Sequence, residues 1–212
     1  MTTAKICGLS TPETVQAALD GKAAFIGFMF FDKSPRKVDA NTAARLAAPV
    51  RNKAKVVAVA VDPTDAEVDD IASILKPDLF QLHGKETPQR AKAVADRTGA
   101  GLIKVFSVSD AAEIEQARAF DGLVDHLMFD AKAPAGSDRP GGTGAKFDWT
   151  LLSGLRFERP YLLAGGLDPW NVTEAVRQSG APIVDVSSGV ERGPGLKDPA
   201  LIEAFLSAVR RT

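Results

Sequence analysis

Cysteine and histidine are scarce in this chain of 212 residues, which contains one Cys and two His. One Cys can form neither an internal disulfide nor a Cys-based zinc site. With two His alone, a metal site would need mostly carboxylate ligands, so we expect no metal site.

A surplus of charge is also absent, because 26 Lys and Arg face 27 Asp and Glu, for a formal net charge of -1. This balance argues against a protein that binds nucleic acid or a membrane surface through bulk electrostatics. The longest apolar run, Ala23–Phe31, is too short to span a membrane. The first residues lack the apolar core of a signal peptide, so we expect a cytoplasmic protein with a reduced thiol.

The sequence does contain an ordinary globular composition, 45% hydrophobic and 25% charged, in a repeating pattern. Short β-branched or aromatic runs alternate with longer stretches of helical spacing. No run alternates apolar and polar residues, which is typical of parallel strands buried on both faces. The eight predicted strands are Phe25–Phe30, Lys55–Val61, Leu102–Phe106, Lys5–Cys7, Leu79–Leu82, His126–Phe129, Tyr161–Ala164 and Ile183–Val186.

Eight helices are predicted between and after these strands, most of them with a capping side chain at the start. The expected starts are Thr11, Asp39, Asp62–Asp65, Thr87, Asp110, Asp148, Asn171 and Asp198. Eight strand–helix units of about 26 residues each fill the chain, and each needs roughly that many. We therefore predict an α/β fold with one domain, residues 1–212, as a single (βα)8 TIM barrel. An open doubly wound sheet would also alternate, but eight strands would be many for it at this length.

Five polar residues stand at or just after predicted strand ends, where the active site of such a barrel lies. They are Cys7, Arg36, His83, Asp130 and Asp185. Taken singly, each has an ordinary structural interpretation: a buried Cys, a hydrogen-bonding His, an Asp that caps a helix. Their joint placement at one rim favours a chemical site.

Three late loops are rich in glycine, around residues 141–144, 165–166 and 187–189. Glycine lets backbone amides approach an anion closely, and barrels often bind phosphate at the loops after strands seven and eight. We expect a phosphate near Gly142, Gly166, Ser188 and Gly189. The plain alternative is that these glycines only form turns. The irregular stretch 131–145 comes directly after Asp130, and we expect it to be mobile and to close on a substrate.

Seven groups of motifs succeed one another from residue 5 to residue 198. They are Lys5-Ile6-Cys7-Gly8; Gly27-Phe28-Met29-Phe30 with Ser34-Pro35-Arg36; Gln81-Leu82-His83-Gly84; Phe129-Asp130; Gly141-Gly142-Thr143-Gly144 with Phe147-Asp148-Trp149; Ala164-Gly165-Gly166-Leu167-Asp168-Pro169-Trp170-Asn171-Val172; and Val184-Asp185-Val186-Ser187-Ser188-Gly189-Val190-Glu191 with Pro194-Gly195-Leu196-Lys197-Asp198. In order and spacing this set resembles the phosphoribosylanthranilate isomerases of tryptophan biosynthesis. Two departures are small: Ser10 stands where the family commonly has Thr, and Asp62 where it often has Asn.

The resemblance implies an Amadori rearrangement of N-(5-phospho-D-ribosyl)anthranilate, a small phosphorylated substrate, with no cofactor. Asp130 matches the family's general acid, which must stay protonated near neutral pH and so needs a raised pKa. Cys7 matches the general base, with an ordinary thiol pKa of about 8.5 that leaves some thiolate. Arg36 would pair with the anthranilate carboxylate. His83 would line and orient, and Asp185 would hydrogen-bond polar groups of the substrate.

Three other interpretations stay open from the residues. Indole-glycerol-phosphate synthase acts next in the pathway, but the matching catalytic lysines are missing and this chain is short. A metal-dependent sugar-phosphate epimerase would need more ligands. A barrel that only binds phosphorylated ligands would need neither Cys7 nor Asp130. The oligomeric state, monomer or homodimer, is not determined by the sequence.

Overall fold

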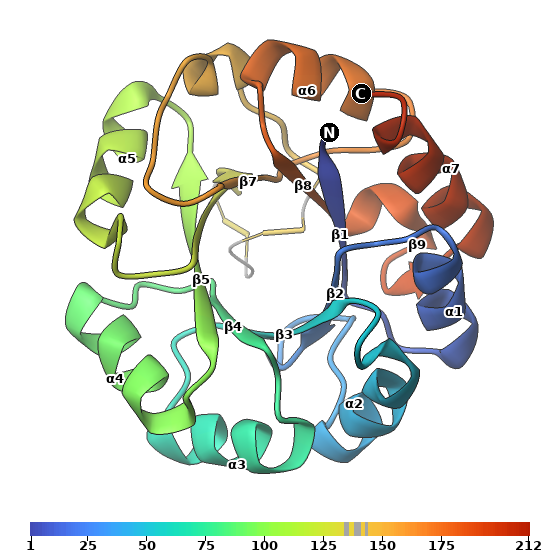
Figure 1. The fold of residues 1–212 in the computed structure, drawn as a ribbon, viewed down its shortest axis with the longest axis vertical. Coiled ribbons are helices and arrows are strands. Elements are labelled where there is room, and N and C mark those ends of the chain that lie inside the picture. Colours follow the sequence, from blue (N-terminus) through green and yellow to red (C-terminus); the bar gives the residue numbers. More distant parts are fainter. Residues whose placement is uncertain (134–135, 138–140, 143) are drawn as a thin grey trace.

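A computed structural model describes residues 1–133, 136–137, 141–142 and 144–212. Within these residues, eight parallel strands pair in chain order and close on themselves as a barrel, with helices around the outside (Figure 1). The strands are β1 (Thr3–Cys7), β2 (Phe25–Met29), β3 (Lys55–Ala60), β4 (Leu79–Leu82), β5 (Gly101–Val108), β6 (His126–Ala131), β7 (Leu162–Leu163) and β8 (Ile183–Val186). The predicted (βα)8 barrel is confirmed, and each predicted strand overlaps an observed one.

The helices begin largely where the sequence predicts. They are α1 (Pro12–Asp20), α2 (Ala40–Ala47), α3 (Asp65–Leu75), α4 (Pro88–Thr98), α5 (Ala111–Gln116), α6 (Val172–Ser179) and α7 (Pro199–Val209). Side chains of Thr11, Asp39, Thr64, Thr87, Asp110 and Asp198 accept backbone N–H bonds at six of these starts. At α6 the predicted start is confirmed, with Asn171 at the N-cap position, but its side chain makes no capping bond and its amide oxygen instead accepts from the Asp168 N–H.

The helix predicted after Asp148 is wrong in type. Asp148 accepts from the Thr150 N–H, but only a 3-10 turn, η3 (Trp149–Leu152), comes after it in the described residues 144–171. Ser153 adopts an extended conformation directly after the turn, with φ -62° and ψ 127°, and Gly154 follows with φ 73°, so the chain leaves the helical path at Ser153. Leu152 is fully buried and Trp149 packs against the core, so the short turn still covers part of the barrel.

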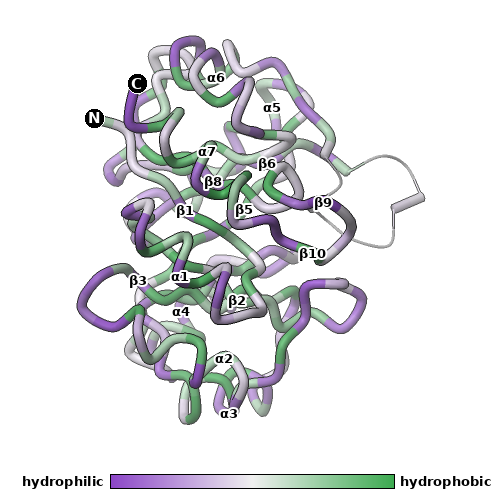
Figure 2. The backbone as a smooth tube through the Cα atoms, turned by 90° about the vertical axis from the view of Figure 1, so that its right-hand side faces the viewer, coloured by the Kyte–Doolittle hydropathy of each residue, from purple (hydrophilic) through white to green (hydrophobic). Residues whose placement is uncertain are grey.

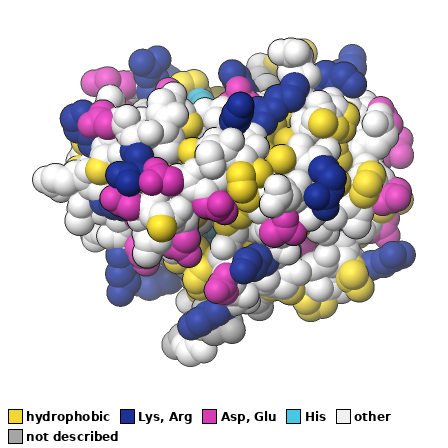
Figure 3. Space-filling model, turned by 90° about the horizontal axis from the view of Figure 1, so that it is seen from below, with side chains coloured by type: hydrophobic (Ala, Val, Ile, Leu, Met, Phe, Trp, Pro, Cys, Tyr) yellow, Lys and Arg dark blue, Asp and Glu magenta, His cyan; other side chains and the backbone are white. Residues whose placement is uncertain are grey.

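Two apolar clusters form the core. The larger lies between strands and helices, and the smaller fills the barrel with inward residues such as Val57, Ile103 and Met128. The connections on the outside include the most hydrophilic stretches of the chain (Figure 2). Positive and negative side chains are mixed on the face shown in Figure 3, in keeping with the near-zero net charge.

One element at the carboxyl ends of the strands is not predicted from the sequence. After β8 and the 3-10 turn η4 (Ser188–Val190), a two-stranded antiparallel hairpin forms from β9 (Glu191–Gly193) and β10 (Leu196–Lys197). It carries two buried charged side chains, Glu191, which pairs with Arg36 in the loop after β2, and Lys197, which pairs with Glu191. None of the described helices is long and apolar enough to cross a membrane.

Candidate active site

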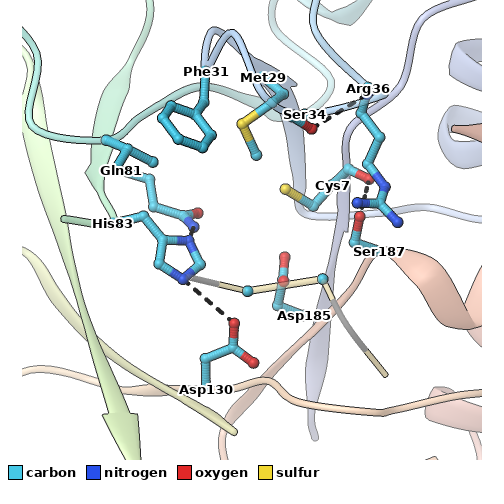
Figure 4. Close-up of a pocket in the computed structure, with 13 residues that line it drawn as sticks. Cys7, Met29, Phe31, Ser34, Arg36, Gln81, His83, Asp130, Asp185 and Ser187 are labelled. Atoms are coloured by element: carbon cyan, nitrogen blue, oxygen red, sulfur yellow. Dashed lines mark hydrogen bonds and ion pairs between the residues drawn. The ribbon is translucent and has the colours of Figure 1, made fainter. Parts of the chain in front are cut away.

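A pocket opens at the carboxyl ends of the strands (Figure 4), and the five predicted residues all line it. The Cys7 thiol points into this cavity from one side, while His83 and Asp130 border it from another. The full lining is Cys7, Met29, Phe31, Ser34, Arg36, Val61, Gln81, His83, Asp130, Gly141, Gly142, Asp185 and Ser187. Strand ends β1, β4, β6 and β8 thus bring a thiol, an imidazole and two carboxylates to one space.

Cys7 lies next to a buried ion pair, between Lys5 and Asp185, that was not predicted from the sequence. Lys5, on the same strand, is 0% exposed, and its ammonium donates to Asp185 Oδ1 at 2.7 Å. Burial raises the pKa of the Cys7 thiol above its ordinary value, and the Lys5 ammonium partly opposes this rise. The thiolate is therefore scarcer than the ordinary thiol pKa expected from the sequence would give.

His83 and Asp130 face each other at the β4 and β6 ends. His83 Nε2 lies 3.4 Å from Asp130 Oδ2, and His83 Nδ1 lies 3.4 Å from the Gln81 side-chain nitrogen. All three side chains are buried or nearly so. A Cβ at Gly141 would come within 2.5 Å of Asp130 Oδ2, so only glycine allows the loop to lie so close over the carboxyl group.

Arg36 is already paired within the protein. Its guanidinium donates from Nε and Nη2 to the two oxygens of Glu191, at 2.6 and 2.8 Å. Lys197 Nζ lies 2.7 Å from the same carboxylate. Two cations on one anion leave this cluster, made of Arg36, Glu191 and Lys197, with an excess of positive charge beside the pocket.

Lys197 also ties the hairpin to the strands. It donates to the backbone oxygen of Ser187 at 2.7 Å, and the Ser187 hydroxyl donates to the Cys7 carbonyl at 3.2 Å. Burial lowers the pKa of Lys197 to about 8, against the opposing attraction of Glu191. Lys5, Glu191 and Lys197 all lie in motifs visible in the sequence, but a long charged side chain ordinarily indicates an exposed position.

The predicted phosphate loops meet in a second hollow next to the first. Gly142, Gly166 and Ser188 line it, together with Asp130, Gly144, Ala145, Ala164, Gly165, Leu167, Asp185, Val186 and Ser187. Gly189 does not line it: a Cβ there would lie 1.9 Å from the Leu167 carbonyl oxygen, so Gly189 serves to pack the two loops together. The expected mobility of 131–145 falls on a stretch in which residues 134–135, 138–140 and 143 lie outside the described residues.

The site and barrel agree with the comparisons to known proteins. The sequence pattern described as N-(5'phosphoribosyl)anthranilate (PRA) isomerase matches residues 4–208. The chain belongs to this family. The family is one of aldose–ketose isomerases in tryptophan biosynthesis.

Relatives in the N-(5'-phosphoribosyl)anthranilate isomerase family match over nearly the full length. The protein of that name from Caulobacter sp. (strain K31) is 66% identical over 212 residues, all of both chains, and one from Rhizobium johnstonii is 51% identical over 98% of this chain and 93% of its own. The crystal structure of the isomerase from Thermotoga maritima has 31% identity and a TM-score of 0.89, with both chains fully covered. A further isomerase structure, in complex with reduced 1-(o-carboxyphenylamino)-1-deoxyribulose 5-phosphate, has 29% identity, a TM-score of 0.85 and full coverage of both chains.

Proposed function

We propose that this chain converts N-(5-phospho-D-ribosyl)anthranilate to 1-(2-carboxyphenylamino)-1-deoxy-D-ribulose 5-phosphate, with Asp130 as general acid and Cys7 as general base. The observation that carries the proposal is the presence of both groups in one pocket of a chain that belongs to the isomerase family. A protein that only bound phosphorylated ligands would need neither group.

The reaction consists of proton transfers around C1 and C2 of the sugar. Asp130 gives its proton to the ring oxygen while the C1–O bond breaks, and the anthranilate nitrogen lone pair forms the C1=N iminium. The iminium acidifies the C2 proton, which the Cys7 thiolate removes to give an enolamine. Protonation of C1 and loss of the C2 hydroxyl proton then yield the ketone. Because these steps need only proton transfers and the opening of the sugar ring, with no external oxidant or reductant, we propose that no cofactor takes part.

Neighbouring groups are assigned to support these steps. His83, beside Asp130, would orient the acid and line the pocket. Because Lys5 uses one Asp185 oxygen, we assign the other oxygen to a hydroxyl of the substrate.

The two anionic ends of the substrate are assigned to two places. The anthranilate carboxylate would bind at the Arg36, Glu191 and Lys197 cluster, whose excess positive charge favours an anion. The phosphate would bind to loops that carry Gly142, Gly166, Ser188 and Gly189, as expected from the sequence. The hollow lined by the first three supports this assignment, because it includes the loops after β7 and β8, where barrels often bind phosphate.

We further propose that residues 1–212 act as one domain in the cytoplasm, where the free Cys7 thiol stays reduced. Either a monomer or a homodimer is compatible with a pocket that one barrel lines. A solved isomerase from Thermotoga maritima is described as dimeric, with monomers generated from it.

The test is an assay in which the purified chain receives phosphoribosylanthranilate and the fluorescence of that substrate is monitored. We expect decay that depends on enzyme concentration, with the ketose product detected by mass. Tight binding of a reduced product analogue without any turnover would overturn the proposal in favour of a binding protein.

A further inference from the structure

Lys5 is a fully buried cation inside the barrel, two residues before the proposed base on the same strand. Removing an ammonium from water costs several kcal/mol unless a partner compensates it. Its partner is Asp185 on β8, at 2.7 Å, and the two residues are register neighbours in the β1–β8 pairing. The core cluster inside the barrel consists of apolar side chains such as Val57 and Ile103. A buried ion pair beside these apolar side chains therefore suggests a function.

The Lys5 ammonium and the Cys7 thiol interact with each other, and both lie over Gly27 of β2, which has no side chain. Gly27 pairs with Cys7 in the β1–β2 register. A Cβ on Gly27 would lie 3.1 Å from Cys7 Sγ and 3.2 Å from Lys5 Nζ. Both atoms thus approach the same point over Gly27, and a methyl group there would touch the two of them at once.

Charged groups surround Cys7 from several elements. Asp185 on β8 raises the thiol pKa, and Lys197 on β10 lowers it less than Lys5 does. Arg36, His83 and Asp130 line the same pocket from the loop after β2 and from the ends of β4 and β6. Among these groups, Lys5 is the cation that acts on the thiol most strongly, and Asp185 holds it in place.

We propose that Lys5 is a positioning residue for the general base: its ammonium, anchored by Asp185 and given room by Gly27, stabilises the Cys7 thiolate. The fraction of thiolate at neutral pH then depends on Lys5, although Lys5 itself takes no proton from the substrate. The proposal rests on Cys7 acting as the base in the proposed function, but the thiol itself can be titrated without substrate.

The experiment titrates the thiol directly. Because the chain has one cysteine, labelling with 13C at Cβ gives one NMR signal whose shift reports ionisation in the folded, substrate-free protein. Three proteins are compared: wild type, Lys5→Met, and Lys5→Met with Asp185→Asn. Lys92→Met is the matched control, because it removes the same charge from an exposed pair with Asp96 on α4.

The order of the midpoints is the expected result. The thiol should titrate lowest in wild type, because Lys5 outweighs Asp185; higher in the double variant, which lacks both charges; and highest in Lys5→Met, which keeps only the carboxylate. We expect at least about one pH unit between wild type and Lys5→Met, and no change in Lys92→Met. If Lys5→Met does not fold with a lone buried carboxylate, the comparison of wild type with the double variant still decides the order. Equal midpoints, or a lower midpoint without Lys5, would overturn the proposal.

Turnover provides the second readout. In Lys5→Met we expect kcat at neutral pH to fall about tenfold or more, with KM changed by less than about twofold, and kcat to recover as the pH is raised. A fall in kcat that is the same at every pH would indicate a merely structural role and contradict the proposal. The proposed base and the proposed role of Lys5 can fail separately. Full turnover in Cys7→Ala would refute Cys7 as the base, while the order of the thiol midpoints tests the effect of Lys5 on the thiol independently of turnover.

Discussion

Arg36 and Glu191 form a bidentate ion pair between side chains that are 5% and 4% exposed and 155 residues apart in sequence. The pair joins the loop after β2 to β9 and fixes the plane of the guanidinium. Glu191 shares its charge with Lys197 as well, so Arg36 is oriented without being neutralised. A substrate carboxylate would bind an Arg36 side chain that Glu191 already holds in one conformation, which lowers the entropy cost of binding.

Arg36→Met should mainly weaken substrate binding. The change keeps an unbranched apolar stem but removes the proposed partner of the anthranilate carboxylate. We expect KM to rise by about tenfold to a hundredfold, from the loss of about 1.5 to 3 kcal/mol for a hydrogen bond to a charged group, with kcat within a few-fold. Steady-state kinetics measure both constants, and an unchanged KM would exclude the assignment.

Glu191→Gln serves as the companion change. It keeps the size of the side chain and Arg36 itself, but removes the charge that orients the guanidinium. KM should rise here too, although less than in Arg36→Met. Glu174→Gln is the matched control, since it alters an exposed pair with Arg177 on α6 and should cost less than about 1 kcal/mol of stability.

Loss of either the proposed acid or the proposed base should remove most of the turnover. Asp130→Asn and Cys7→Ala each remove one proton-transfer group, and we expect kcat to fall by about 10²–10⁴. Binding of a reduced product analogue, measured by calorimetry, should change little, because neither group is assigned to the anionic ends. Near wild-type kcat in both variants would refute the mechanism.

Much of the barrel and part of the site can be predicted from local sequence. The strands β2 and β3 are continuous apolar runs, and Thr11, Thr64 and Thr87 stand at helix starts because their short side chains reach backbone N–H groups. Cys7 and Asp130 were recognisable as strand-end residues, because parallel strands in a barrel present their carboxyl ends on one rim.

Local sequence does not reveal which distant charges meet. Lys5 and Asp185 are 180 residues apart, and Arg36 reaches Glu191 only because β9 folds back over the β2 loop. Burial of such charges depends on partners that the closed barrel supplies. The helix wrongly predicted after Asp148 has a similar cause. Asp148 is a good cap, but the turn ends at the extended Ser153, which is followed by the left-handed Gly154, while the turn itself packs on the core.

Gly27→Ala should impair the site although its backbone conformation suits alanine. Gly27 lies in β2, and it is absent from the positive-φ glycines, so the cost comes from contact alone. A methyl group must displace Cys7 Sγ or Lys5 Nζ by a few tenths of an ångström. We expect about 1 to 3 kcal/mol of lost stability and a kcat reduced by at least about tenfold.

The matched control is Gly193→Ala, whose nearest side-chain atom would be at 3.7 Å, an ordinary contact. Its stability by urea unfolding and its kcat should stay near wild type. If Gly27→Ala also keeps wild-type stability and kcat, then the close contacts of Cys7 Sγ and Lys5 Nζ with Gly27 do not constrain the thiol.

Lys197 should make stability rise with pH across a mildly alkaline window. Burial lowers its pKa from 10.5, the ordinary value expected in the unfolded chain, to about 8 in the folded one. Between these values the unfolded state binds more protons at Lys197 than the folded state does. The free energy of unfolding therefore increases as the pH rises through this window, and this contribution of Lys197 is lost as the pH falls through about 8. The raised pKa of Cys7 has the opposite sign at alkaline pH, but wild type and a Lys197 variant both carry that thiol.

The measurement is urea unfolding of wild type and Lys197→Met at about pH 7.5 and about pH 9.5. The difference in unfolding free energy, wild type minus variant, should increase by about 1 to 2 kcal/mol between these pH values. A matched change at the exposed Lys132, whose pKa is raised by Glu113, should give no such increase over the same range. A difference that is constant with pH would mean that Lys197 stays protonated in the folded enzyme throughout this range. Its contact with Glu191 would favour that protonated state, and the positive charge beside the pocket would then not change with pH.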